Sequence, residues 1–84
     1  RQMVEIINES IFEKKIQKIK DATLKEKLKK QIRKIVENPT IGKPMMYERK
    51  RTREVYIHPF RLSYTYKESD NKIIFLDLYH KNEQ

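Results

Sequence analysis

Arg61 and His80 are the side chains in this sequence whose type and position best suit chemistry on a phosphate group. Arg61 stands near the start of a segment of alternating apolar and polar residues, and a guanidinium held on a strand suits bidentate phosphate binding. His80 ends a second such segment, and histidine suits proton transfer near neutral pH. Both have simpler interpretations, in which Arg61 pairs with Glu54 across a hairpin and His80 is a surface residue. His58 precedes a proline in a turn and is expected to be structural.

A second group of candidates is basic or aromatic. Residues 43–53 carry five basic side chains against Glu48, a local charge of +4. Such a run can follow an RNA backbone, bind carboxylates of a protein partner, or keep an edge strand soluble. A tyrosine on an open sheet face can stack on a nucleobase. The residues that we assign to RNA binding are Arg49, Lys50, Arg51, Arg53, Tyr56 and Lys81.

The composition argues against several classes of site. The 84 residues include no Cys, which excludes disulfides, thiolate metal ligands and a cysteine nucleophile. With two histidines and no Asp/Glu cluster at metal-ligand spacing, we expect no bound metal. There is no glycine-rich phosphate loop, and we expect no small-molecule cofactor. No apolar run approaches a membrane span and no signal peptide is visible, so the sequence predicts a cytoplasmic protein without a membrane partner.

The first half of the chain predicts one short strand and two amphipathic helices. The β-branched run at residues 3–7 predicts the strand. Ser10 is a candidate N-cap for a helix whose apolar residues recur at helical spacing between residues 11 and 19. Residues 23–26 have the spacing of a capping box for a second, strongly basic helix. Pro39 ends it and opens a loop to residue 46, and we expect the two helices to pack as an antiparallel hairpin.

The second half has a period of two residues. Residues 53–57, 60–66 and 72–79 predict three strands, and turns at residues 58–59 and 69–71 make them an antiparallel meander. The sequence therefore predicts an α+β fold, with a small antiparallel sheet and an N-terminal helix hairpin packed on one face. A chain of this length makes one domain, residues 1–84.

The short turn at residues 58–59 also predicts the pairing of the first two of these strands. Tyr56 should oppose Arg61, and Glu54 should oppose Ser63. The face toward the helices then carries Val55, Ile57, Phe60, Leu62 and Tyr64. The opposite face carries Glu54, Tyr56, Arg61, Ser63 and Thr65. No helix remains to cover this polar face, which makes it the expected place for a site. The third strand should end beside the start of the second, with Tyr79 and His80 near Phe60 and Arg61.

Three motifs follow one another along the chain, namely a loop with two parts, a strand, and the end of the last strand. Glu37-Asn38-Pro39 precedes Gly42-Lys43-Pro44, an aromatic-Arg-apolar-X-Tyr strand spans Phe60–Tyr64, and the last strand ends in Tyr79-His80-Lys81. In this order the motifs resemble the RelE/ParE superfamily of toxins from type II toxin–antitoxin systems, over nearly the whole chain. The resemblance agrees with the α+β fold predicted above.

The resemblance implies a ribosome-dependent mRNA endonuclease that inhibits translation. Such toxins cut the message by attack of the 2′-OH on the scissile phosphate, so we expect a metal-independent reaction. Arg61 matches the family's phosphate-contacting arginine, His80 the proton-transfer histidine of YoeB-like members, and Tyr79 the tyrosine before it. The position of the carboxylate base holds methionine in this chain. Glu48 or Glu54 would take its place, and Glu54 is the one that we assign as catalytic.

The implied partners are a cognate, RelB-like antitoxin and the ribosome with its mRNA. The net charge of +8 predicts attraction to a polyanion or an acidic protein. We expect the basic second helix and residues 49–53 to attract an acidic antitoxin. The alternative function is that of ParE-like members, which share the Arg-Glu-apolar strand and the His-basic ending and poison DNA gyrase without nuclease chemistry. A third possibility is a family member that retains antitoxin binding alone.

Overall fold

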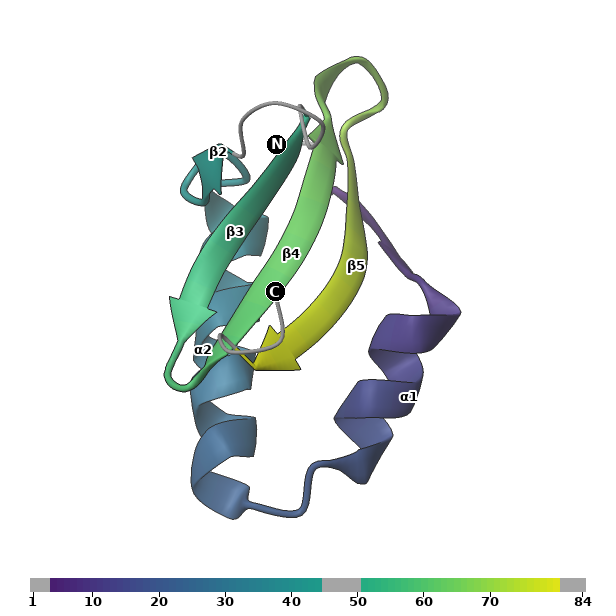
Figure 1. Cartoon of the computed structure of the whole chain (residues 1–84). Helices are drawn as coiled ribbons and strands as arrows, with labels where there is room; N and C mark the ends of the chain where they lie inside the picture. Colours follow the sequence, from purple (N-terminus) through teal and green to yellow (C-terminus); the bar gives the residue numbers. More distant parts are fainter. Residues whose placement is uncertain (1–3, 45–50, 81–84) are drawn as a thin grey trace.

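Five strands form one sheet in the order β1-β5-β4-β3-β2 (Figure 1). This computed structural model describes residues 4–44 and 51–80. The strands are β1 (Glu5–Asn8), β2 (Lys43–Pro44), β3 (Thr52–Ile57), β4 (Phe60–Lys67) and β5 (Lys72–His80). β1 pairs parallel with β5, and the other neighbouring strands are antiparallel. The predicted meander is therefore confirmed as β3-β4-β5, at the centre of the sheet.

Two helices precede most of the sheet, α1 (Ser10–Lys18) and α2 (Ala22–Glu37). They spread apart from a three-residue connection, with α2 behind the sheet and α1 beside β5 in Figure 1. The predicted hairpin is thus correct in its short connection, but each helix packs on a different strand, α1 on β5 and α2 on β3. An ion pair between Lys15 Nζ and Asp77 Oδ1, 2.8 Å apart, holds α1 against β5. Neither described helix has the length and apolarity needed to cross a bilayer.

The core lies between the helices and the central strands. Phe12 of α1 stacks on Phe75 of β5, with ring centroids 5.4 Å apart. The buried apolar side chains of the described residues are Phe12, Leu28, Ile35, Ile57, Leu62, Tyr64, Ile73, Phe75 and Leu78. Val55 and Phe60 are partly buried against this cluster. The predicted assignment of the core face of β3 and β4 is therefore confirmed, and the fold is α+β as expected.

The helix N-termini differ from the sequence prediction. Glu9 rather than Ser10 occupies the N-cap of α1, and no side-chain hydrogen bond caps that end. α2 begins earlier than the predicted capping box, because Asp21 is its N-cap. The Asp21 Oδ1 atom accepts hydrogen bonds from the backbone N–H groups of Thr23 at 2.9 Å and Leu24 at 3.4 Å. An aspartate at the N-cap satisfies donors that the helix leaves unpaired, so Thr23 lies inside the first turn.

The chain segments flanking the helices also differ in detail. The predicted loop over residues 39–46 contains the short strand β2, which pairs with Arg53 and Glu54 of β3. The first strand, predicted at residues 3–7, is β1 at Glu5–Asn8 within the described residues. The predicted pairing of β3 with β4 is confirmed position by position, from Ile57 opposite Phe60 to Glu54 opposite Ser63.

Candidate functional site

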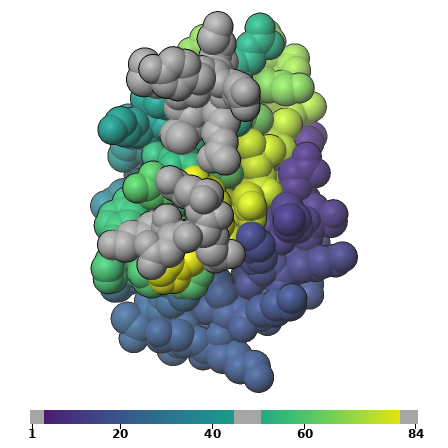
Figure 2. Space-filling view, in the orientation of Figure 1, coloured from purple at the N-terminus to yellow at the C-terminus, as the bar shows by residue number. Residues whose placement is uncertain are grey.

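Three side chains lie in one row across the open face of the sheet. Arg61 of β4 is opposite Tyr56 of β3 on one side and Tyr79 of β5 on the other. Side chains at directly paired positions share a face, so this row points away from the helices. Figure 2 views the molecule from this open face, with α1 at its right and the beginning of α2 at its lower end.

Glu54 is the centre of the site. Its side chain is only 7% exposed, and it is the one charged residue that is buried within residues 4–44 and 51–80. Arg61 Nη1 donates to Glu54 Oε1 at 3.4 Å, and the Tyr79 hydroxyl donates to Glu54 Oε2. A buried carboxylate is costly unless it is paired and hydrogen-bonded, and these two donors supply that compensation. The ion pair between Arg61 and Glu54, which was the simpler interpretation of Arg61, does form. It is part of a network of three residues that also includes Tyr79.

The position of Tyr79 depends on a bulge in β5. Ser63 is opposite Asp77 whereas Tyr64 is opposite Phe75, so Leu76 is an extra residue without a partner. One extra residue in a strand moves every side chain after it to the opposite face of the sheet. Before the bulge, Ile73 and Phe75 face the core; beyond it, Leu78 does. Tyr79 is consequently turned to the open face, beside Arg61.

His80 lies on the other side of the sheet from Arg61. It is paired with Phe60, and the two rings meet edge to face with centroids 5.6 Å apart. The sequence placed Tyr79 and His80 near Phe60 and Arg61, and the strand pairing confirms this, but consecutive strand residues point to opposite faces. The structure therefore brings Tyr79 to Arg61 and places the His80 ring against Phe60.

His58 is a residue that the sequence analysis assigned only to the turn. The Tyr56 hydroxyl and His58 Nδ1 are 2.7 Å apart, and the two rings meet edge to face. Tyr56 is 51% exposed, so its ring is accessible on the open face next to Arg61. The alternation of residues 54, 56 and 58 along β3 and into the turn is the signal that could have placed His58 on this face.

Among the described residues assigned to RNA binding, Tyr56 lies beside Arg61, whereas Arg51 and Arg53 do not. Arg53 lies on the core side opposite Tyr64, and its Nη1 atom donates to the carbonyls of Thr40 at 3.1 Å and Gly42 at 2.8 Å. These contacts hold the loop before β2 and give Arg53 a structural role, while its assignment to RNA binding stays a prediction. Arg51 is exposed at the far end of β3, and its carbonyl accepts a hydrogen bond from the Thr65 hydroxyl. Arg49, Lys50 and Lys81 lie outside the described residues.

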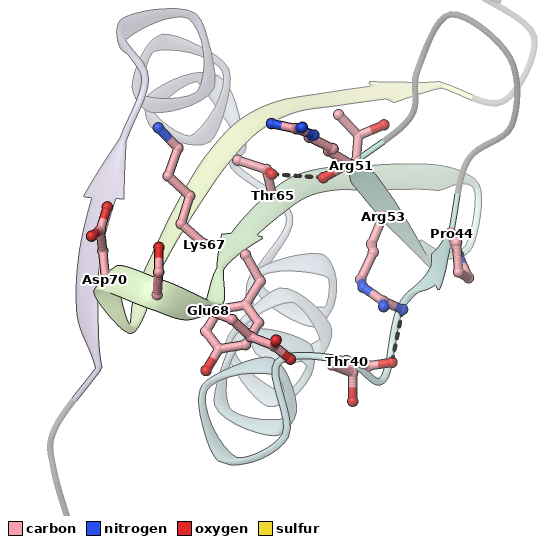
Figure 3. A pocket seen from close by; sticks show the side chains of 11 residues that line it. Thr40, Pro44, Arg51, Arg53, Thr65, Lys67, Glu68 and Asp70 are labelled. Carbon is pink, nitrogen blue, oxygen red and sulfur yellow. Dashed lines mark hydrogen bonds between the residues drawn. The ribbon is translucent and has the colours of Figure 1, made fainter.

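Among the residues that the structure describes, two grooves flank the sheet. One, of about 630 Å³, lies at the end of β4 remote from Arg61 and is shown in Figure 3. Its wall includes Arg51 and Lys67, but also Glu68 and Asp70, so its charge is mixed. The other, of about 300 Å³, lies between the helix connection and the sheet. It has apolar walls from Ile19, Leu24, Phe60 and Leu78, with Lys15, Lys18, Lys20 and Asp21 also lining it.

Tyr64 of β4 joins the sheet to the loop before β2 through hydrogen bonds. Its buried hydroxyl donates to the Pro39 carbonyl at 2.8 Å and accepts from the Gly42 N–H at 2.9 Å. Burial raises the pKa of Tyr64 above its usual value, although the Gly42 hydrogen bond and the Arg53 charge oppose this. A Cβ atom at position 42 would stand 2.6 Å from the Tyr64 hydroxyl, so only glycine fits there.

Comparisons with known proteins give one matching family model and several solved structures of the same fold. The sequence model described as "ParE toxin of type II toxin-antitoxin system, parDE" matches residues 7–84. Comparison with curated protein sequences finds no significant match. Among solved structures, the Escherichia coli RelBE toxin–antitoxin complex has a TM-score of 0.78 at 16% identity, covering 92% of this chain and 95% of that one. Mycobacterium tuberculosis RelBE2 has a TM-score of 0.79 at 16% identity, covering 95% and 100%. The Pyrococcus horikoshii RelE–RelB complex has a TM-score of 0.74 at 11% identity, covering 99% and 100%.

Proposed function

The chain belongs to the ParE toxin family of type II toxin–antitoxin systems, and on that premise we propose that it inhibits translation by cleaving ribosome-bound mRNA. The observation that supports this choice is the network of Arg61, Glu54 and Tyr79 on the open face. It combines a cation, a carboxylate and a proton-carrying hydroxyl, which are the groups that 2′-OH attack on a phosphate needs. The solved structures of RelE toxins share the fold and are consistent with this proposal.

Arg61 is the proposed phosphate-binding residue. Its side chain is 38% exposed, so a phosphate can approach from solvent. In the free protein its Nη1 atom contacts Glu54 at 3.4 Å, which is long for a charge-assisted hydrogen bond. A transition state that resembles a phosphate dianion binds the guanidinium more strongly than this Glu54 contact does, because it offers two oxygens in bidentate geometry. Binding of the phosphate would release Glu54 Oε1 for the 2′-OH.

Glu54 and Tyr79 form the proposed proton path. Glu54 Oε1 takes the proton of the 2′-OH as the O2′–P bond forms and the P–O5′ bond breaks. The leaving 5′-oxygen takes the hydroxyl proton of Tyr79. After product release the tyrosinate takes a proton from water, and Glu54 gives its proton to water. The residues end in their starting protonation states, and the product carries a 2′,3′-cyclic phosphate. No step in this path requires a metal ion.

His80 was the sequence-based choice for proton transfer, and it remains the competing candidate for that role. Its pairing with Phe60 on the core side favours Tyr79 instead. Tyr56 is proposed to stack on a base beside the cut, because its ring is exposed next to Arg61.

An antitoxin is the proposed protein partner, as in the RelBE and RelE–RelB complexes that this fold matches. Antitoxins in this proposal cover the open face and exclude RNA from Arg61. The basic chain attracts an acidic partner.

The second candidate function is that of a gyrase poison. The observation that favours it is the family model itself, which describes ParE rather than RelE toxins. In that case the open face binds protein, and Glu54 and Tyr79 support Arg61 without moving protons.

One experiment separates these functions. The purified chain is added, with a chelator present, to ribosomes programmed with mRNA and, in parallel, to a gyrase supercoiling reaction. We expect mRNA cleavage with 2′,3′-cyclic phosphate ends, and no cleavage when the nucleotide at the cut carries 2′-deoxyribose. Intact mRNA beside inhibited supercoiling would replace the proposal with the gyrase function. Intact mRNA with unaffected gyrase would leave antitoxin binding as the retained activity.

A further inference from the structure

The positive charge of this protein is concentrated in the helices rather than around Arg61. Residues 10–37 contain ten basic and four acidic side chains, which is +6 of the total +8. α2 lies behind the sheet, on the side away from the open face (Figure 1). The site on the open face therefore accounts for little of the charge, and a separate explanation is needed for the helix layer.

Six exposed basic side chains on α2 form what we call the α2 ridge: Lys25, Lys27, Lys29, Lys30, Arg33 and Lys34. At about 100° and 1.5 Å per residue, they fall into two rows, and within each row successive side chains are about 4.5–6 Å apart along the helix axis. Lys25, Lys29 and Arg33 make the first row, and Lys27, Lys30 and Lys34 the second. The acidic side chains of α2 are Glu26 and Glu37, and Glu26 is 3.9 Å from Lys29, with both of them about two-thirds exposed.

The ridge does not help α2 to fold. Like charges four residues apart destabilise a helix by about 0.2–0.5 kcal/mol per pair. Lys25 and Lys29, Lys29 and Arg33, and Lys30 and Lys34 are such pairs. α2 is held instead by its buried side, through Leu28 and Ile35. An arrangement that costs stability and contributes nothing to packing points to a binding role for the ridge.

The chemistry of the ridge suits RNA better than protein. Protein interfaces depend on apolar or aromatic anchors, and they are depleted in lysine. The large apolar side chains exposed among the described residues are Ile6, Ile11, Ile41 and Tyr56, none of which belongs to α2. Nucleic-acid interfaces are far more positive, and phosphate contacts alone can supply their affinity. Two rows of cations on opposite flanks of one helix also match two backbone strands bordering a groove.

We propose that the α2 ridge binds the phosphate backbone of double-stranded RNA, on the face of the molecule opposite Arg61. The protein then holds structured RNA with its helix layer while the open face stays accessible to a single strand. This assignment deepens the proposed ribosomal function, since ribosomes are rich in RNA duplex, but the binding itself is independent of cleavage.

The test compares two variants of equal net charge. One replaces the first row, as Lys25→Gln, Lys29→Gln and Arg33→Gln. The matched control carries Lys14→Gln, Lys18→Gln and Lys67→Gln, three exposed lysines outside α2. Affinity for a short RNA hairpin is measured from about 50 to 200 mM salt. Proteins for this measurement also carry Arg61→Ala, so that the open face contributes less to binding.

We expect the row variant to bind the hairpin at least about tenfold more weakly near 0.1 M salt. The slope of log K against log salt concentration should be smaller in magnitude by about 2–3. The control should change the slope by less than about 1. With Arg61 intact, the row variant should raise the KM for programmed ribosomes and leave kcat unchanged. If the row variant does not fold, the second row, Lys27→Gln, Lys30→Gln and Lys34→Gln, gives the same comparison.

Equal effects of the row variant and the control would overturn the proposal, because they would show diffuse attraction rather than a defined surface. Unchanged hairpin binding by the row variant would also overturn it. A row variant that loses affinity for the antitoxin alone would assign the ridge to an acidic protein. If the parent chain binds the hairpin through the ridge but leaves mRNA intact, the proposed cleavage fails and the ridge assignment stands.

Discussion

Arg61 and Tyr79 both donate to the Glu54 carboxylate within the described part of the chain, and this changes what each single substitution in the site should do. Arg61 and Tyr79 both compensate a carboxylate that is only 7% exposed. Removal of either donor therefore affects stability as well as chemistry. The most informative substitutions at the residue scale are those that keep the shape and change one chemical property.

Arg61→Lys is the substitution that separates phosphate geometry from charge. Lysine keeps a cation near Glu54 but cannot bind a phosphate in bidentate fashion. We expect the cleavage rate on ribosomes to fall by roughly 10²-fold or more, about 3 kcal/mol of transition-state stabilisation, with a small change in Tm. Arg61→Ala should additionally cost roughly 1–3 kcal/mol of stability, because it removes one donor from Glu54. Wild-type cleavage by the Arg61→Lys protein would remove Arg61 from the proposed site.

Glu54→Gln tests the proposed base. The amide keeps the size of the carboxylate and can still accept the Tyr79 hydrogen bond, so the fold should persist. It cannot take a proton from the 2′-OH, and we expect the single-turnover rate to fall by about 10²–10⁴-fold. Glu48→Gln is the companion variant, since Glu48 is the other carboxylate that the sequence offered. A large loss in Glu48→Gln with little loss in Glu54→Gln would transfer the role of base to Glu48.

Tyr79→Phe and His80→Ala distinguish the two candidates for proton transfer. Tyr79→Phe removes the hydroxyl that bonds Glu54, and we expect the cleavage rate to fall by about 10²–10⁴-fold. His80→Ala removes a ring that packs on Phe60 on the opposite side, and we expect a loss of less than about tenfold. Measurement of both rates on the same ribosome preparation decides between them. The reverse order of effects would restore His80 to the role that the sequence predicted.

At the scale of elements, the sheet and the loop before β2 are joined by buried polar contacts rather than by apolar packing. Tyr64 and Arg53, neighbours across β4 and β3, both bind backbone groups of residues 39–42. This explains why the segment ahead of β2 holds a defined position although it carries few apolar residues.

Tyr64→Phe should destabilise the protein by about 1–3 kcal/mol at neutral pH, because the Pro39 carbonyl and the Gly42 N–H each lose a buried partner. The raised pKa of Tyr64 adds a pH dependence. The folded state holds this proton more tightly than the unfolded chain, so its contribution is complete below about pH 10 and falls as pH rises above that value.

Urea unfolding of both proteins at neutral pH and above pH 10 measures this effect. The difference in stability between wild type and Tyr64→Phe should shrink at alkaline pH. A constant difference across that range would show that Tyr64 ionisation is not linked to unfolding. Gly42→Ala provides a second check, since its methyl group would displace the Tyr64 hydroxyl from its buried position and should both destabilise the fold and weaken its alkaline dependence.

At the scale of the whole molecule, the net charge of +8 should speed the encounter with acidic partners. We expect the association rate with an acidic antitoxin to fall as salt rises from low to physiological ionic strength, where the screening length is about 8 Å. Stopped-flow mixing measures this rate, and the complex should no longer cleave mRNA. An association rate that does not change with salt would count against electrostatic steering, while leaving the antitoxin as a partner.

The sequence by itself determined the two helices, the three central strands and the register of the central hairpin. Alternation of apolar and polar residues is a local property, and a two-residue turn at His58-Pro59 allows one register, so Tyr56 opposite Arg61 and Glu54 opposite Ser63 were predictable. The same reasoning identified the open face as the place for Arg61. The parallel pairing of β1 with β5 was not predictable in this way, because its partner lies far along the chain.

Tertiary structure decided which side chains meet Arg61. Simple alternation from Ile73 and Phe75 would have turned Tyr79 toward the core, and the extra residue Leu76 reverses this. A bulge depends on how β4 and β5 match along their whole length, which no short pattern in either strand encodes. In the sequence, Arg53 is likewise only one residue of a basic run. The folded structure shows that its side chain donates hydrogen bonds to two backbone carbonyls. Local periodicity thus determined the strands, while long-range pairing selected the residues of the site.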